Sequence, residues 1–100
     1  MLFAAFAALS PAELPAQQVH TGEIRQIRVD SASSASICVS TAPDMPGGLI
    51  ACLYSTRPLF QEMKDLLLRA FERKARCAFE WTQVDSLTQR ARIDALSCSL

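Results

Sequence analysis

Four cysteines restrict the fold of this 100-residue chain more than any other feature: Cys38, Cys52, Cys77 and Cys98. A domain of this size is marginal on its hydrophobic core alone, so a covalent staple is expected. No Cys-x-x-Cys motif is present and the single histidine, His20, is distant from the cysteines, so the spacing predicts neither a zinc site nor a thioredoxin-like redox motif. The pattern favours two disulfides in an exported protein. The alternative is four buried free thiols in a cytosolic protein.

The first sixteen residues differ in composition from the rest of the chain. They are mostly apolar and contain no Lys or Arg. An apolar stretch of about ten residues is too short for a bilayer, which needs roughly 20. Residues 1–16 therefore read as a signal peptide cleaved after Ala16, without stable membrane insertion. This leaves a secreted or periplasmic domain over residues 17–100. The alternative is an N-terminal helix packed on the domain, although Pro15 would end that helix at once.

The charge pattern excludes several classes of function. Ten basic and ten acidic residues balance, whereas a nucleic-acid-binding face needs a basic excess. His20 has no carboxylate neighbour in sequence and is expected to be a solvated side chain rather than a catalytic one. Residues 47–48 form a glycine pair inside a turn rather than a phosphate-binding loop. Nothing in the sequence suggests a catalytic constellation, a metal site or a cofactor. We therefore expect a binding or assembly module and not an enzyme.

The clearest local element is a β-hairpin. Two strand-like segments, residues 36–40 and 49–54, flank a segment at 42–48 that is dense in turn residues. If Cys38 lies opposite Cys52, one face of the hairpin becomes apolar and a slip by one residue would spoil it. That apolar face consists of Ile37, Val39, Ala51 and Leu53. The agreement between the cysteine register and the hydrophobic register predicts a Cys38–Cys52 bond, which leaves Cys77 to pair with Cys98.

The other face of this hairpin carries the predicted cystine together with polar side chains. These polar side chains, which are the candidate ligand-binding residues, are Ser36, Ser40 and Tyr54. Trp81 is a second candidate for ligand contact, as a stacking platform for a sugar or a base, although a place in the core fits it better.

The remaining segments complete a recognisable order. Residues 22–29 predict a first strand with a bulge, because Ile24 falls on the opposite face from Ile27 and Val29. A hydroxyl cap and a first-turn proline at residues 55–58 open a helix that runs to about Arg76. Its apolar stripe consists of Leu59, Met63, Leu66, Leu67, Ala70 and Phe71. Its predicted i,i+4 ion pairs are Asp65–Arg69 and Glu72–Arg76.

Two further strands, residues 76–81 and 91–98, close the chain. The order β-β-β-α-β-β is that of the OB-fold, a mainly β, five-stranded barrel with one amphipathic helix between its third and fourth strands. The alternative architecture is a split α+β sheet.

A resemblance to a known family rests on three short stretches. Residues 20–24 read His-Thr-Gly-Glu-Ile, residues 37–39 read Ile-Cys-Val, and residues 51–52 read Ala-Cys. Together with the helix and the late cysteine, they resemble the B subunits of subtilase-cytotoxin and pertussis-like AB5 toxins over about residues 20–98. They also resemble small standalone exported OB-fold proteins of bacteria.

The toxin resemblance implies a pentameric OB-fold that binds sialylated or related glycans and docks a catalytic subunit. Two departures matter. Ala12 falls where the family has a serine in its glycan pocket, and residues 82–84 do not match the family's tryptophan-rich segment. No sugar-binding residue therefore carries over. Two functions stay open: a B-subunit-like module that binds a glycan and a partner subunit, and a monomeric exported OB-fold protein with a structural or inhibitory role and no small ligand.

Overall fold

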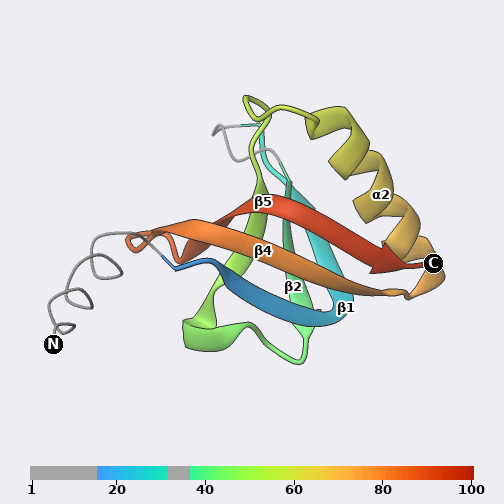
Figure 1. Ribbon diagram of the computed structural model, residues 1–100, viewed down its shortest axis with the longest axis horizontal. Coiled ribbons are helices and arrows are strands. Elements are labelled where there is room, and N and C mark those ends of the chain that lie inside the picture. Colours follow the sequence, from blue (N-terminus) through green and yellow to red (C-terminus); the bar gives the residue numbers. More distant parts are fainter. Residues whose placement is uncertain (1–15, 32–36) are drawn as a thin grey trace, which may run out of the picture.

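The computed structural model describes residues 16–31 and 37–100, which form a five-stranded barrel with one α-helix (Figure 1). Residues 1–15 of the expected leader, and Ser36, lie outside the described residues. No helix among the described residues is long and apolar enough to cross a bilayer. The elements in chain order are β1 (Gln18–Val29), β2 (Ile37–Ala42), the 3-10 turn η2 (Pro46–Gly48), β3 (Ile50–Leu53), α2 (Phe60–Arg73), β4 (Arg76–Asp85) and β5 (Arg90–Ser99).

The strands close into a barrel in the order β1-β2-β3-β5-β4, with β4 returning to β1. All neighbours are antiparallel except β3 and β5, which run parallel. The long strand β1 makes closure possible, because it pairs with β4 through its first half and with β2 through its second half. This is the OB-fold order, so the predicted fold class is confirmed and the split α+β sheet is wrong.

β1, which pairs with both β4 and β2, contains a β-bulge. The register against β2 shifts between Ile24 and Gln26, which confirms the predicted bulge. In a regular strand, Ile24 and Ile27 would point to opposite faces of the sheet. With the bulge between them, Ile24 is buried and Ile27 packs against the core. Val29 does not follow Ile27 inward. Its side chain is 73% exposed, because it lies at the end of the strand.

Both disulfides join residues that lie directly opposite each other in neighbouring strands. Cys38 pairs with Cys52 between β2 and β3, and Cys77 pairs with Cys98 between β4 and β5. Val39 faces Ala51 in the predicted register, so the hydrophobic pattern and the covalent bond agree. In the chain-entropy model, closing loops of 14 and 21 residues stabilises the fold by roughly 3 kcal/mol each. The alternative of four free thiols is wrong.

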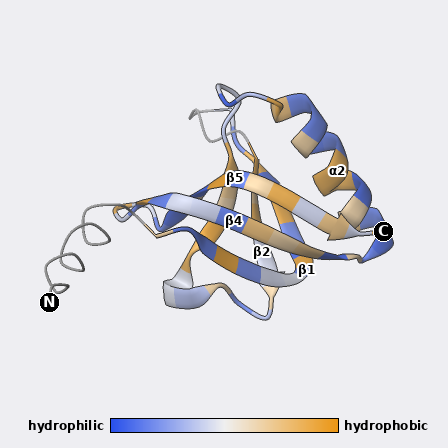
Figure 2. Cartoon of the chain, in the orientation of Figure 1, coloured by the Kyte–Doolittle hydropathy of each residue, from blue (hydrophilic) through white to orange (hydrophobic). Residues whose placement is uncertain are grey.

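The barrel interior is apolar and α2 covers one of its openings. Hydrophobic and hydrophilic residues alternate along the strands, as Figure 2 shows for β4 and β5. α2 packs on β1, β3 and β5 through Leu67 and Ala70, which are fully buried, with Phe60 and Met63 beside them. Trp81 is 3% exposed and belongs to this core, so the interpretation of Trp81 as a stacking platform is wrong.

The helix is shorter than its sequence pattern predicted. It begins at Phe60 rather than near residue 55, and Leu59 before it adopts a left-handed conformation, with φ of 62°, and makes no side-chain cap. Leu59 is 65% exposed, so its predicted place on the buried stripe is wrong. Phe71, which was expected beside the stripe, is also exposed, at 40%. The start is displaced because the backbone N–H of Arg57 bonds to the carbonyl of Tyr54, which holds this segment in a turn.

The helix end differs as well. Lys74 adopts a left-handed conformation, with φ of 54°, and ends the helix at Arg73, so Arg76 belongs to β4. Glu72 and Arg76 are therefore no longer one helical turn apart. Neither that ion pair nor Asp65–Arg69 forms among the described residues.

We expect Leu67→Ala to lower the free energy of unfolding by about 2–5 kcal/mol, because truncation of a fully buried leucine leaves a cavity. Arg69→Ala, on the exposed side of the same helix, should change it by less than about 0.5 kcal/mol. Urea unfolding of the oxidised protein measures both variants. Equal losses would contradict the placement of α2 on the barrel.

Candidate functional site

The first candidate surface lies on the outside of the barrel around the Cys38–Cys52 disulfide. Side chains alternate along β2 and β3, so Ile37 and Val39 point into the core and Cys38 points outward. The disulfide, Tyr54 and Ile50 form a small apolar cluster separate from the core. We call this surface the cystine face. It is the surface on which the hairpin pattern placed Ser36, Ser40 and Tyr54.

A hollow of about 500 Å³ lies on the β5 side of the cystine face, and we call it the Tyr54 hollow. Its lining consists of Tyr54, Gln83, Val84, Asp85, Arg90 and Arg92. The guanidinium carbon of Arg92 lies 4.6 Å from the centre of the Tyr54 ring, in cation–π contact. Tyr54 itself is buried, so the charged plane of Arg92 covers the ring. The exposed chemistry of this hollow is therefore guanidinium, carboxylate and amide.

The charges around the Tyr54 hollow differ in how they are compensated. Arg90 lies 4.0 Å from the carboxylate of Asp30. Arg92 forms no ion pair with any residue in the described ranges, and its guanidinium group lies over the face of the Tyr54 ring. A guanidinium without a carboxylate partner keeps its donors for water or for a ligand. Arg92 is thus the residue of this hollow most ready to bind.

Ser40 lines a different and smaller hollow on the β1 side of the disulfide. This hollow has a volume of about 200 Å³ and is lined by Gln26, Arg28, Cys38, Val39, Ser40 and Ile50. Ser40 and Tyr54 thus share the cystine face, as predicted, but they do not converge on one pocket. Ser36 lies outside the described residues.

An ion pair that sequence reasoning missed supports the Tyr54 end of this face. Arg57 donates to Asp94, and Thr82 donates to the second carboxylate oxygen of Asp94 at 3.2 Å. These contacts tie the segment after β3 to β4 and β5. The sequence did contain one indication of Asp94. It follows Arg90 and Arg92 at two-residue spacing, which places all three side chains on the outer face of β5. Nothing local pointed to Arg57 as its partner.

The His-Thr-Gly stretch that contributed to the family resemblance has a structural role here. The Nε2 atom of His20 lies 3.1 Å from the Thr41 hydroxyl oxygen and 2.9 Å from the Pro43 carbonyl oxygen. Since the Thr41 hydroxyl donates to that same carbonyl, Nε2 carries the proton. A Cβ on the buried Gly22 would lie 2.9 Å from the Ala42 carbonyl oxygen, which requires glycine there. His20 was expected to be solvated, and it instead ties β1 to the turn after β2.

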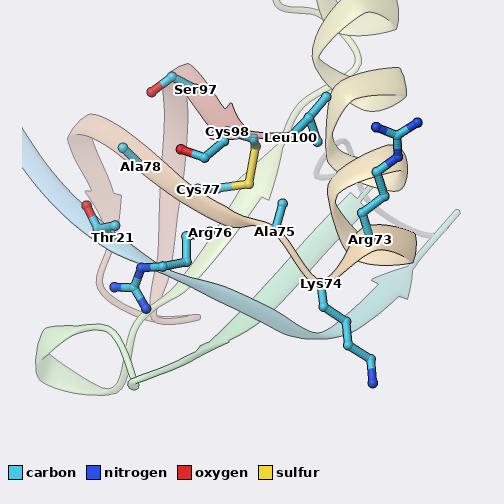
Figure 3. Close-up of a pocket in the computed structure, with 11 residues that line it drawn as sticks. Thr21, Arg73, Lys74, Ala75, Arg76, Cys77, Ala78, Ser97, Cys98 and Leu100 are labelled. Atoms are coloured by element: carbon cyan, nitrogen blue, oxygen red, sulfur yellow. A yellow bond between two sulfur atoms is a disulfide. The ribbon is translucent and has the colours of Figure 1, made fainter.

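A second hollow, also of about 500 Å³, lies at the other end of the β4–β5 hairpin, and we call it the basic hollow (Figure 3). The Cys77–Cys98 disulfide lies at its centre in Figure 3, with Arg73 on one side and Arg76 and Thr21 on the other. Its full lining is Thr21, Arg73, Lys74, Ala75, Arg76, Cys77, Ala78, Ser97, Cys98, Ser99 and Leu100. In neither large hollow, nor elsewhere in residues 16–31 and 37–100, do three metal-ligating side chains gather.

Comparison with solved structures supports the fold. A chain from a crystal structure of human heat-labile enterotoxin in complex with a blood group A antigen analog superposes with a TM-score of 0.61. The alignment covers 89% of this chain and 91% of that chain, at 15% sequence identity. The two chains share one fold. This confirms, at the level of the fold, the resemblance to toxin subunits. No protein-family model matches the chain, and no curated protein matches it significantly in sequence.

Proposed function

We propose that this chain is an exported, non-catalytic module that binds a glycan on its cystine face and assembles with other subunits. The observation that carries the proposal is the Tyr54 hollow, a polar depression on the outer face of an OB-fold barrel. OB-folds bind oligosaccharides and oligonucleotides on the face of their second and third strands and at the loops nearby, including the one between the fourth and fifth strands. The Tyr54 hollow lies between the end of β3 and the tip of the β4–β5 hairpin.

The side chains of this hollow suit a sugar. Gln83 offers both a donor and an acceptor, Asp85 accepts, and Arg92 donates along two edges of a plane. Neighbouring sugar hydroxyls need such mixed, closely spaced partners. A volume of about 500 Å³ is within the range of small-ligand sites. The neighbour with the same fold was crystallised with a blood group A antigen analog, which supports a glycan as ligand.

A near-neutral chain lacks the basic excess that nucleic-acid binding needs, so among OB-fold ligands the glycan is favoured. Export is supported by both disulfides, which persist in oxidising compartments. The signal peptide over residues 1–16 belongs to the same proposal.

Assembly is supported by an exposed apolar flank of α2. Leu68 and Phe71 lie three residues apart on the helix, beside the side that seals the barrel, and are 41% and 40% exposed. These side chains are therefore free to pack against another subunit. We propose that they contribute to a homo-oligomeric ring, a pentamer by the toxin resemblance, which would present several cystine faces together and dock a catalytic or other partner subunit.

Glycan binding is tested with an array of sialylated and neutral oligosaccharides, followed by calorimetry on the best ligand. We expect Arg92→Gln to weaken binding by about tenfold or more, because hydrogen bonds to charged groups typically contribute 1.5–3 kcal/mol. Arg69→Gln removes the same charge from the exposed side of α2 and should leave the affinity unchanged. An array without any bound glycan, or full affinity in Arg92→Gln, would contradict the site.

Assembly is tested by light scattering of the oxidised protein. We expect an oligomer that Leu68→Glu/Phe71→Glu converts to a monomer, because two buried charges would oppose packing of that helix face. Leu87→Glu, at the 94% exposed hairpin tip, is the matched control and should stay oligomeric. A clean wild-type monomer at micromolar concentration would instead favour the standalone OB-fold protein with a structural or inhibitory role.

A further inference from the structure

Arg92 has an acidic neighbour on its own strand with which it does not pair. Arg92 and Asp94 are two residues apart in β5, on either side of the buried Ile93, so their side chains lie on the same outer face of the barrel. At a rise of roughly 3.3 Å per residue their Cα atoms are separated by roughly 7 Å, which a long side chain can span. No ion pair joins them in the described ranges. Asp94 is instead engaged by other residues.

Both carboxylate oxygens of Asp94 accept hydrogen bonds from elsewhere in the barrel. Arg57 donates through Nη2 to Oδ1, and the Thr82 hydroxyl donates to Oδ2 at 3.2 Å. The side chains of Arg57 and Asp94 are 31% and 25% exposed, so salt and water screen their ion pair only in part. A carboxylate that is held at both oxygens has little capacity left for a second cation. Arg57 therefore competes with Arg92 for Asp94, and Arg57 holds it.

The geometry of the Arg57 contact is not the one that stability alone would select. Arginine pairs most strongly with a carboxylate through two parallel hydrogen bonds. Here one of the two oxygens of Asp94 goes to Thr82, and the Nε atom of Arg57 is buried without a hydrogen-bond partner among the described residues. An unpartnered buried donor costs free energy. The arrangement is weaker than a two-bond pair, but it engages Asp94 from two separate segments of the chain.

The same turn places this contact beside the Tyr54 ring. The backbone N–H of Arg57 donates to the carbonyl oxygen of Tyr54 at 3.0 Å, and the Arg92 guanidinium carbon lies 4.6 Å from the centre of the Tyr54 ring. A cation over a ring face keeps its N–H donors for other acceptors, because the ring takes no classical hydrogen bond from them. Pairing with Asp94 would use those donors and neutralise the charge.

We propose that Arg57 is a positioning residue of the Tyr54 hollow: by engaging Asp94, it keeps Arg92 on the Tyr54 ring and available to a ligand. This role rests on the proposed function, in which Arg92 binds the glycan. Loss of Arg57 releases one oxygen of Asp94, which then attracts Arg92 away from the ring. Removal of the Asp94 charge at the same time abolishes that competition.

The first test is NMR of the oxidised full chain without any ligand. Protons over the face of an aromatic ring resonate upfield, so the side-chain protons of Arg92 report its contact with Tyr54. We expect Arg57→Met to move these resonances toward their random-coil positions, because the released Asp94 pairs with Arg92. In Arg57→Met/Asp94→Asn no carboxylate competes, so the wild-type shifts should return. A purely structural defect from the loss of Arg57 would not be repaired by a second substitution in the same pair.

The second test is calorimetry with the oligosaccharide that the glycan array selects. We expect Arg57→Met to weaken binding by about threefold or more, and Arg57→Met/Asp94→Asn to restore the wild-type affinity. Arg25→Met is the matched control. It breaks the exposed Arg25–Asp44 ion pair, which lies outside the lining of the Tyr54 hollow, and should bind as the wild type does. Urea unfolding midpoints verify that the variants are folded.

Arg92 resonances that stay at their wild-type positions in Arg57→Met would overturn this role. Equal loss of affinity in the single and the double variant would overturn it too, because the second substitution would then have relieved no competition. A wild-type protein that binds no glycan would contradict the proposed function alone, since the NMR test of Arg57 needs no ligand.

Discussion

Closure of the barrel depends on the register between β2 and β3, which the Cys38–Cys52 disulfide holds. These strands share only three residue pairs, so their hydrogen bonds alone specify the register weakly. A slip by one residue would turn Val39 and Ala51 out of the core and bring the outward residues in. β3 also pairs with β5 in parallel, so an error between β2 and β3 would extend to the strand that completes the barrel. The disulfide removes the slipped states from the ensemble that the folding chain can reach.

The same alternation that fills the core creates the proposed binding face. With Ile37 and Val39 inside, the disulfide and Ser40 must lie outside. The parallel pairing of β3 with β5 then brings the outward residues Arg90 and Arg92 alongside, next to Tyr54. This placement puts the guanidinium plane of Arg92 over the buried ring of Tyr54. The amide of Gln83 and the carboxylate of Asp85 line the same hollow. Fold stability and the proposed glycan site therefore share one structural cause.

Features encoded by neighbouring residues could be predicted from the sequence, and features made by distant contacts could not. The hairpin register was predictable because cysteine spacing and hydrophobic alternation coincide within 14 residues. The displaced helix start was not, because the turn at Arg57 accompanies an ion pair with Asp94, 37 residues away. His20 was misjudged for the same reason, since its partners Thr41 and Pro43 lie on another strand and turn. Within the site, alternation placed Ser40 and Tyr54 on one face but could not show that they line separate hollows.

Peptide mapping of the unreduced protein, with digestion under conditions that block thiol exchange, tests the central claim most directly. The barrel described above requires Cys38 linked to Cys52 and Cys77 linked to Cys98, with no free thiol. Both links join residues that lie opposite each other in adjacent strands, so recovery of these two cross-linked peptides confirms the register on which the fold and the cystine face depend. Recovery of Cys38 linked to Cys77 or to Cys98, or of four free thiols in protein isolated from an oxidising compartment, would contradict it.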